Sequence, residues 1–155
     1  MSPKGHPGEK TVASNRRARF DYEILESFEA GLVLTGPEVK SVRAGQVSLS
    51  ESFARVQGAE VWLEGMHVAR YEQAKERQEE RRPRKLLMHR REIDKLIGKT
   101  AEHGLTLIPM RLYFTHGIAK VELGLGKGKR KHEKRQAIAE REANREIERN
   151  VGRRR

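Results

Sequence analysis

The stretch LTLIPMRLYFTHGIAKVELGL, residues 105–125, decides the fold of this 155-residue chain. It contains two runs rich in branched and aromatic apolar residues, 105–114 and 118–125, which are typical of β-strands. His116 and Gly117 stand between the runs, and glycine readily adopts the backbone angles of a tight turn. The stretch therefore predicts an antiparallel β-hairpin.

The residues before this hairpin predict two helices and a loop. Apolar residues recur at helical spacing over 90–103, and Gly104 follows as a helix end. A shorter helix is expected after Thr35, because Pro37 suits a first helical turn. Residues 70–85 carry almost no apolar side chain, so we expect a solvated loop or an irregular helix there.

Alternation of apolar and polar residues predicts further strands. Two are expected at 47–57 and 60–68, and a longer one begins near Phe20 and bends or bulges near Gly31. One side of this longer strand is expected to carry the apolar residues Phe20, Tyr22, Ile24, Phe28, Ala30, Leu32 and Leu34. The predicted fold is mainly β: an antiparallel body with two helices packed on it, most economically closed as a small barrel.

Composition excludes several classes of protein. The chain has no cysteine, which removes disulfides and thiolate zinc sites. No apolar run approaches the roughly 18 residues of a membrane-spanning helix, and the N-terminus lacks the hydrophobic part of a secretory signal. We therefore expect a cytoplasmic monomer without a membrane partner. Its expected parts are a flexible N-terminus (1–14), one domain (15–126) and a basic tail (127–155).

The tail carries a large share of the net charge of +11, because residues 127–155 hold twelve Lys and Arg but only five Glu. Its apolar stripe is thin, and an isolated helix with so little burial is marginal in water. The tail is expected to be disordered when free and helical in an anionic groove. A compact body with such an arm indicates RNA or DNA, most plausibly within a large nucleic-acid assembly.

Two apparent catalytic or cofactor motifs do not hold. The alternating glycines of 124–129 have neither the spacing of a P-loop nor the helix that a dinucleotide fingerprint must open. They are expected to loosen the chain where it leaves the body. The six histidines are scattered without metal-ligand spacing, and no nucleophile stands beside a base. We therefore expect neither an enzyme nor a cofactor.

Three features are candidates for RNA contact, each with a structural alternative. The cluster Asn15–Arg19 is either a solvated charged face or a grip on phosphates, with Asn15 reaching a base or a 2′-OH. Glu29 is either a charge that blunts a strand or an acceptor for base and ribose donors. Most apolar residues of Arg84–His89 are expected in the core, although one could remain outside to pack on an unstacked base.

Five motifs occur together and in order along the chain: Asn15–Tyr22 (NRRARFDY), Phe28–Leu32 (FEAGL), Gly36–Gly45 (GPEVKSVRAG), Arg84–His89 (RKLLMH) and Gly126–Arg130 (GKGKR). Their combination closely resembles the SsrA-binding protein (small protein B) family, from about Val12 to the end of the chain. The resemblance implies an OB-like barrel of roughly six antiparallel strands with helices outside. It also implies that the protein binds transfer-messenger RNA and delivers it to ribosomes stalled on messages without a stop codon.

The resemblance also implies residue roles. The tail of such proteins enters the small-subunit decoding centre and the empty message channel, where it replaces codon–anticodon pairing. Glu133 stands where the family usually has Asp, which keeps the charge but adds a methylene. The tail residues that match are His132, Glu133, Lys134 and Arg135. The residues that match the face holding the tRNA-like domain are Asn15, Arg16, Arg17, Arg19, Glu29, Leu87 and His89.

Two functions therefore remain after the sequence alone. The favoured one is an RNA-binding adaptor for ribosome rescue, with transfer-messenger RNA and the ribosome as partners and no DNA. The alternative is a structural ribosomal protein with a basic extension, which would share the charge pattern and the tail. High-salt sedimentation separates them, because a structural protein stays with the subunits whereas an adaptor washes off.

Overall fold

The computed structural model describes residues 8–71, 79–101, 104–129 and 131–153. Its longest strands are β8 (Leu105–Thr115) and β9 (Ile118–Gly128), which pair antiparallel from the turn outward. His116 and Gly117 adopt φ angles of 50° and 76°, in the left-handed region that tight hairpin turns require. The predicted hairpin is confirmed.

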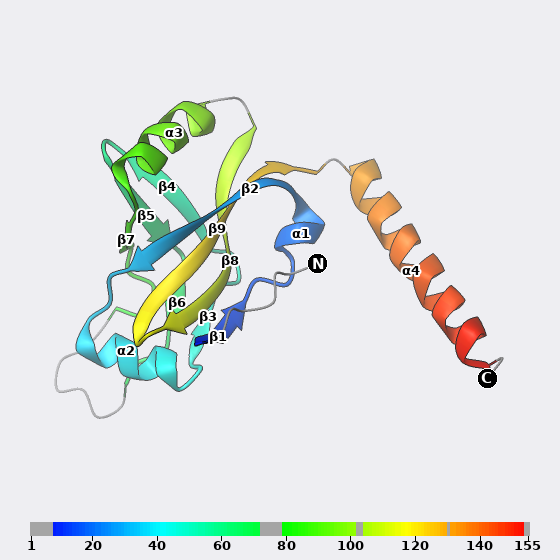
Figure 1. Cartoon of the computed structure of the whole chain (residues 1–155), viewed down its shortest axis with the longest axis horizontal. Coiled ribbons are helices and arrows are strands. Elements are labelled where there is room, and N and C mark those ends of the chain that lie inside the picture. Colours follow the sequence, from blue (N-terminus) through cyan, green and yellow to red (C-terminus); the bar gives the residue numbers. More distant parts are fainter. Residues whose placement is uncertain (1–7, 72–78, 102–103, 130, 154–155) are drawn as a thin grey trace.

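The remaining strands complete a mainly antiparallel sheet of seven strands (Figure 1). Their order is β1-β8-β4-β5-β7-β2-β9, and β9 also pairs with β8, so the pairing returns to a strand already in the sheet. The other strands of this sheet are β1 (Glu9–Ser14), β2 (Tyr22–Leu32), β4 (Phe53–Gln57), β5 (Glu60–Glu64) and β7 (Arg84–Leu87). A separate pair is formed by β3 (Val47–Ser48) and β6 (His67–Val68).

Three helices flank the sheet: α1 (Ala18–Asp21), α2 (Gly36–Arg43) and α3 (Arg90–Ala101). In Figure 1, α3 and α2 lie at opposite ends of the strands, and α1 precedes β2. The helix predicted after Thr35 is α2. The Thr35 hydroxyl accepts from the Glu38 N–H, and the Glu38 carboxylate accepts from the Thr35 N–H, a reciprocal capping box. The helix predicted at 90–103 is α3, and residues 102–103 lie outside the described chain.

The alternation in β2 is broken by a bulge at Leu25, not near Gly31. Ile24 pairs with Gly126 and Glu26 with Leu125, so Leu25 has no partner and its side chain is exposed. A one-residue insertion moves the following side chains to the other face. The prediction that one side carries all the apolar residues is therefore wrong, because Phe28 lies in the main core and Ile24 packs in a second cluster.

The glycines of β9 make room for this second cluster, which contains Ala18, Ile108 and Met110. A Cβ on Gly126 would lie 2.9 Å from Ile108 Cδ1, closer than real Cβ atoms approach, and 3.2 Å from Ile24 Cδ1, which is also tight. The expectation that these glycines loosen the chain is wrong. They lie within a strand, where the absence of a side chain lets two isoleucines pack over it.

Other boundaries also differ from the sequence prediction. Residues 9–14, expected to be flexible, form β1, which is antiparallel to β8. The strand predicted at 47–57 is divided into β3 and β4, and the one predicted at 60–68 into β5 and β6. Of the segment predicted as a solvated loop, residues 72–78 lie outside the described chain, but Arg84 and Lys85 begin β7.

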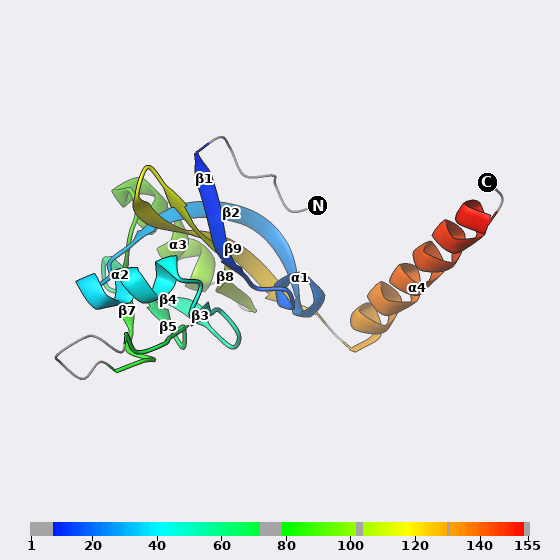
Figure 2. The ribbon, with the colours of Figure 1, turned by 90° about the horizontal axis from the view of Figure 1, so that it is seen from below.

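The tail contains one long helix, α4 (Lys131–Arg153), which stands apart from the sheet in both views (Figures 1 and 2). This differs from the expectation of a disordered free tail. Its sequence favours the helix through alanines and through opposite charges three residues apart, such as Glu142 and Arg145. Residues 135–136 and 138–150 are all exposed.

Candidate nucleic-acid interface

The turn between β1 and α1 presents the arginine cluster. The Asn15 N–H donates to the Met110 carbonyl at 2.8 Å, and its side-chain Nδ2 donates to the Pro109 carbonyl at 3.1 Å. Met110 is the extra residue of a bulge in β8, since Pro109 pairs with Leu123 and Arg111 with Glu122. Asn15 therefore ties the turn to a fixed point of the sheet.

The arginines of this turn point into solvent. Arg16, Arg17 and Arg19 are all exposed. Arg17 Nε lies 3.6 Å from Asp21 Oδ2, and its guanidinium carbon lies 5.2 Å from the Phe20 ring centroid. Such exposed pairs are weak, so the cluster can exchange them for phosphate contacts at small cost.

Glu29 lies on β2 and is held by side chains of two neighbouring strands. The Tyr113 hydroxyl donates to Glu29 Oε2, and Lys120 Nζ lies 3.6 Å from Oε1. Burial raises the pKa of Tyr113, and the hydrogen bond to the Glu29 carboxylate raises it further. Tyr113 thus remains a neutral donor, and Glu29 presents an oriented carboxylate whose side chain is still about half exposed.

A second carboxylate pair extends this network toward β1. Arg111 Nε lies 2.7 Å from Glu122 Oε2, and Arg111 Nη2 lies 3.1 Å from Glu9 Oε2. The same guanidinium lies 4.0 Å from the centroid of the Tyr113 ring, which it covers. Burial lowers the pKa of Arg111, but its hydrogen bonds to Glu122 and Glu9 outweigh burial and raise it. Arg111 is therefore a fixed positive charge behind Tyr113.

Leu87 shares a face of the sheet with Glu29. It pairs directly with Gly31 of β2, and Glu29 is two residues away on the same strand, so both side chains point to the same side. Leu87, the last residue of β7, is 55% exposed, whereas Leu86 beside it is buried. His89 is also exposed, and its carbonyl accepts from Glu92 and Ile93 at the start of α3.

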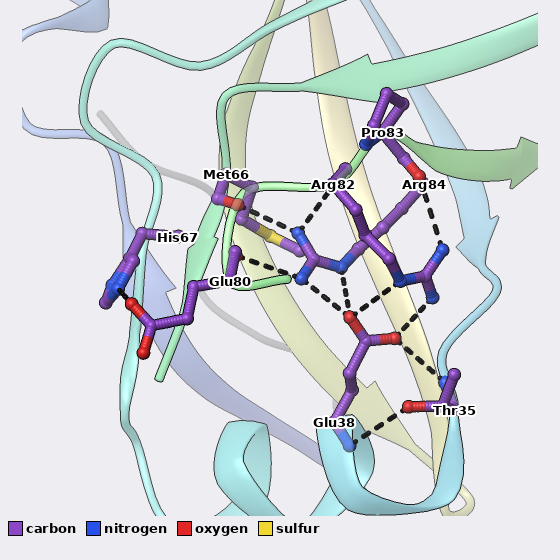
Figure 3. A network of polar contacts seen from close by, with 8 residues as sticks. All are labelled: Thr35, Glu38, Met66, His67, Glu80, Arg82, Pro83 and Arg84. Carbon is purple, nitrogen blue, oxygen red and sulfur yellow. Dashed lines mark hydrogen bonds and ion pairs between the residues drawn. The ribbon is translucent and has the colours of Figure 1, made fainter. Parts of the chain in front are cut away.

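Arg84, in the same motif, has a structural role (Figure 3). It is fully buried, and it donates to Glu38 Oε2 at 2.7 Å and to the Met66 carbonyl at 2.8 Å. Arg82 donates to the same carboxylate. Burial would raise the pKa of Glu38, but hydrogen bonds from Arg82, the Thr35 N–H and Arg84 lower it. This ion cluster fastens β7 to α2 and so helps to position Leu87.

The sequence-predicted residues thus form two groups on the body and one on the tail. Asn15 and the three arginines gather at α1, whereas Glu29, Leu87 and His89 lie along β2, β7 and the start of α3. In α4, Arg135 is exposed, and the side chains of His132, Glu133 and Lys134 lie outside the described residues.

Sequence reasoning missed the two residues that hold Glu29 and the arginine that covers one of them. Tyr113, Lys120 and Arg111 stand in runs that read simply as hairpin strands. The sequence did contain a signal for one of these contacts. The turn at His116 and Gly117 sets the register of the hairpin and places Lys120 opposite Tyr113. The contact of both residues with Glu29 required the pairing of β2 with β9, which the sequence does not specify.

Within the described parts of the chain, no three His, Asp or Glu side chains are grouped to hold a metal ion. None of the helices described is both long and apolar enough to span a bilayer.

The family model for SmpB protein matches residues 12–153. The chain belongs to the SmpB family. The match includes the arginine cluster, Glu29 with Tyr113 and Lys120, the motif around Leu87 and the whole of α4.

Individual relatives of this SmpB-family chain agree with the family match. An SsrA-binding protein of Desulforudis audaxviator is 61% identical over 142 residues, which cover 91% of this chain and 93% of that protein. One from Acidothermus cellulolyticus is 57% identical over 148 residues, which cover 95% and 93%. A chain in the solved structure "tmRNA-SmpB: a journey to the center of the bacterial ribosome" is 48% identical, with a TM-score of 0.65, and the match covers 81% of this chain and 92% of that one.

Proposed function

We propose that this protein binds transfer-messenger RNA and delivers it to stalled ribosomes for trans-translation. The observation that carries the proposal is the family match over residues 12–153, which includes both the body and the tail. The protein acts as a cytoplasmic monomer and an adaptor: it is not an enzyme, it uses no cofactor, and its partners are RNA and the ribosome but not DNA.

The body acts as an OB-like closed barrel. The pairings β8-β4-β5-β7-β2-β9 and then β9 back to β8 support closure, because each of these strands has a partner on both sides. A closed barrel presents a fixed outer surface, and OB folds use such surfaces for oligonucleotides. The binding domain therefore extends over residues 15–126, with β1 as an added strand, and the tail over 127–155.

The RNA face of the body combines charge with shape. Arg16, Arg17 and Arg19 bind phosphates of the tRNA-like domain, and Asn15 supports their turn. Glu29 accepts hydrogen bonds from base or ribose donors, since Tyr113 and Lys120 hold its carboxylate in place. Leu87 packs on an unstacked base beside His89, which explains a leucine left 55% exposed.

The tail acts in the decoding centre, where it stands in for codon–anticodon pairing. Lys134 and Arg135 bind rRNA phosphates, His132 stacks on a base, and Glu133 replaces the family's usual Asp. The exposure of the described side chains of α4 supports this role, because Arg135, Arg141, Arg145 and Arg149 share one exposed side of the helix.

The test is recovery of the protein from cells, with sequencing of the RNA that accompanies it. An adaptor leaves the ribosomal subunits at high salt together with one small RNA. Retention on subunits after that wash, without enrichment of a small RNA, would contradict the proposal and favour a structural ribosomal protein.

A further inference from the structure

A hollow of about 770 Å³ lies between the arginine turn and the loop before β4. One wall is the turn from Ser14 to Tyr22, which carries Arg16 and Arg17. The other wall is the segment Ser50–Phe53, which no motif in the sequence singled out. Ile108 of β8, a member of the second apolar cluster, also lines the hollow.

The Ser50–Phe53 wall has a defined shape. Glu51 adopts a φ of 61°, a left-handed conformation that is uncommon for a residue other than glycine. Gly65 lies against it, so that a Cβ there would be 2.9 Å from the Glu51 carbonyl oxygen. The Ser52 N–H and hydroxyl both donate to the buried Leu49 carbonyl. Strained backbone that the surroundings hold in place is common at binding sites.

Phe53 is the residue that this wall presents. Its side chain is 44% exposed, although it begins a strand whose next residue, Ala54, is in the main core. Tyr22 lines the hollow from the other wall and is half-buried. An exposed aromatic ring opposite exposed guanidiniums is the combination with which proteins bind unpaired nucleotides, through stacking and phosphate contacts.

We propose that this hollow binds one unpaired nucleotide of the RNA held by the body. The base stacks on the Phe53 ring, and Arg16 and Arg17 contact its phosphate. Arg17 exchanges its exposed ion pair with Asp21, at 3.6 Å, for this phosphate contact. Glu51, which also lines the hollow, can accept a hydrogen bond from an exocyclic amino group or a 2′-OH. The inference rests on the proposed function and adds to it a second base contact, distinct from the one at Leu87.

A substitution series at Phe53 tests the stacking. The probe is a transcript of the tRNA-like domain of transfer-messenger RNA, and its binding is measured for Phe53→Tyr, Phe53→Leu and Phe53→Ala. Removing an aromatic ring on which a base stacks lowers the affinity for RNA by about tenfold or more. We expect Leu and Ala to weaken binding by that factor and Tyr to stay within about twofold of wild type. Ile118→Ala, at an exposed apolar residue beside the hairpin turn, is the matched control and should change nothing.

The outcomes separate the site from the proposed function. Wild-type affinity for Phe53→Leu, or equal losses for all variants together with lower thermal stability, would overturn the nucleotide site. If wild type binds the transcript no more tightly than an unrelated tRNA, the proposed function fails. The hollow is then tested by binding of a single-stranded oligouridine to the same Phe53 variants. Weaker binding by the Leu and Ala variants than by wild type and the Tyr variant supports the site, and equal binding by all of them overturns it.

Discussion

The sheet and the tail helix α4 obtain their conformations in different ways. The sheet surrounds a core in which Val61, Leu63 and Leu123 are completely buried, and its polar side chains are fixed by neighbours on other strands. Every described side chain of α4 is exposed, so the helix rests mainly on its own sequence. Its contact with the body is at α1, where the Arg141 guanidinium carbon lies 6.0 Å from the Phe20 ring centroid. The comparison teaches that the body can present a shape prepared in advance, whereas the tail must gain its remaining stability from whatever surface it meets.

The largest effect on the body should come from Arg84→Ala. This change leaves the carboxylate of Glu38, which is 2% exposed, without its buried partner. Breaking a buried ion pair costs about 3–5 kcal/mol of unfolding free energy. Urea unfolding monitored by Trp62 fluorescence measures it. Arg82→Ala is the control and should lose less, because that arginine is partly exposed. Equal losses would show that Glu38 does not depend on Arg84 in particular.

A smaller loss is expected from Gly126→Ala. The new methyl group would lie 2.9 Å from Ile108 Cδ1, and overpacking of this kind costs about 1–3 kcal/mol. Gly128→Ala in the same strand is the matched control, because nothing lies within 4 Å of its added Cβ. Thermal unfolding of both variants gives the comparison. If the two lose the same stability, packing of the second cluster over β9 is not the reason for the glycine.

Local features of the fold could be predicted from the sequence, but contacts between distant residues could not. The hairpin at 105–125 and the helix after Thr35 followed from local signals: turn residues, apolar runs and a cap. The pairing of Glu38 with Arg84 could not, since 46 positions separate them in the chain. The bulge at Leu25 was also hidden, because the sequence does not show where a strand takes up one extra residue and so turns its later side chains to the other face. Within the motif Arg84–His89, the sequence predicted that one apolar residue could stay outside, but not that the Arg84 guanidinium would be buried.

Substitutions on the RNA face should change the affinity for RNA and leave the free energy of unfolding nearly unchanged. Arg17→Ala should lower the slope of log affinity against log salt by about 0.7–0.9, the value for one phosphate contact. Glu29→Gln should weaken binding with little change in that slope, because it removes an oriented acceptor and not a phosphate contact. Titrations of the tRNA-like domain at several salt concentrations measure both. Tighter binding by Glu29→Gln would show that the carboxylate only repels RNA.

The smallest effect on the body should come from changes within α4. Ala143→Gly weakens a helix by about 1 kcal/mol, yet it should shift the unfolding of the sheet by less than about 0.5 kcal/mol. Circular dichroism would record the loss of helix, and Trp62 fluorescence would record the unchanged body. A matching loss in both signals would mean that tail and sheet stabilise each other, contrary to the comparison.

The most direct test of the account is a chain that ends at Lys129, measured in two assays. One is equilibrium binding to isolated transfer-messenger RNA, and the other is the yield of tagged nascent chains on ribosomes stalled without a stop codon. The account predicts a modest loss of RNA affinity, from the missing cations, and a collapse of tagging. Normal tagging by the truncated protein, or a loss of RNA binding in proportion to the loss of tagging, would contradict the division of labour between body and tail.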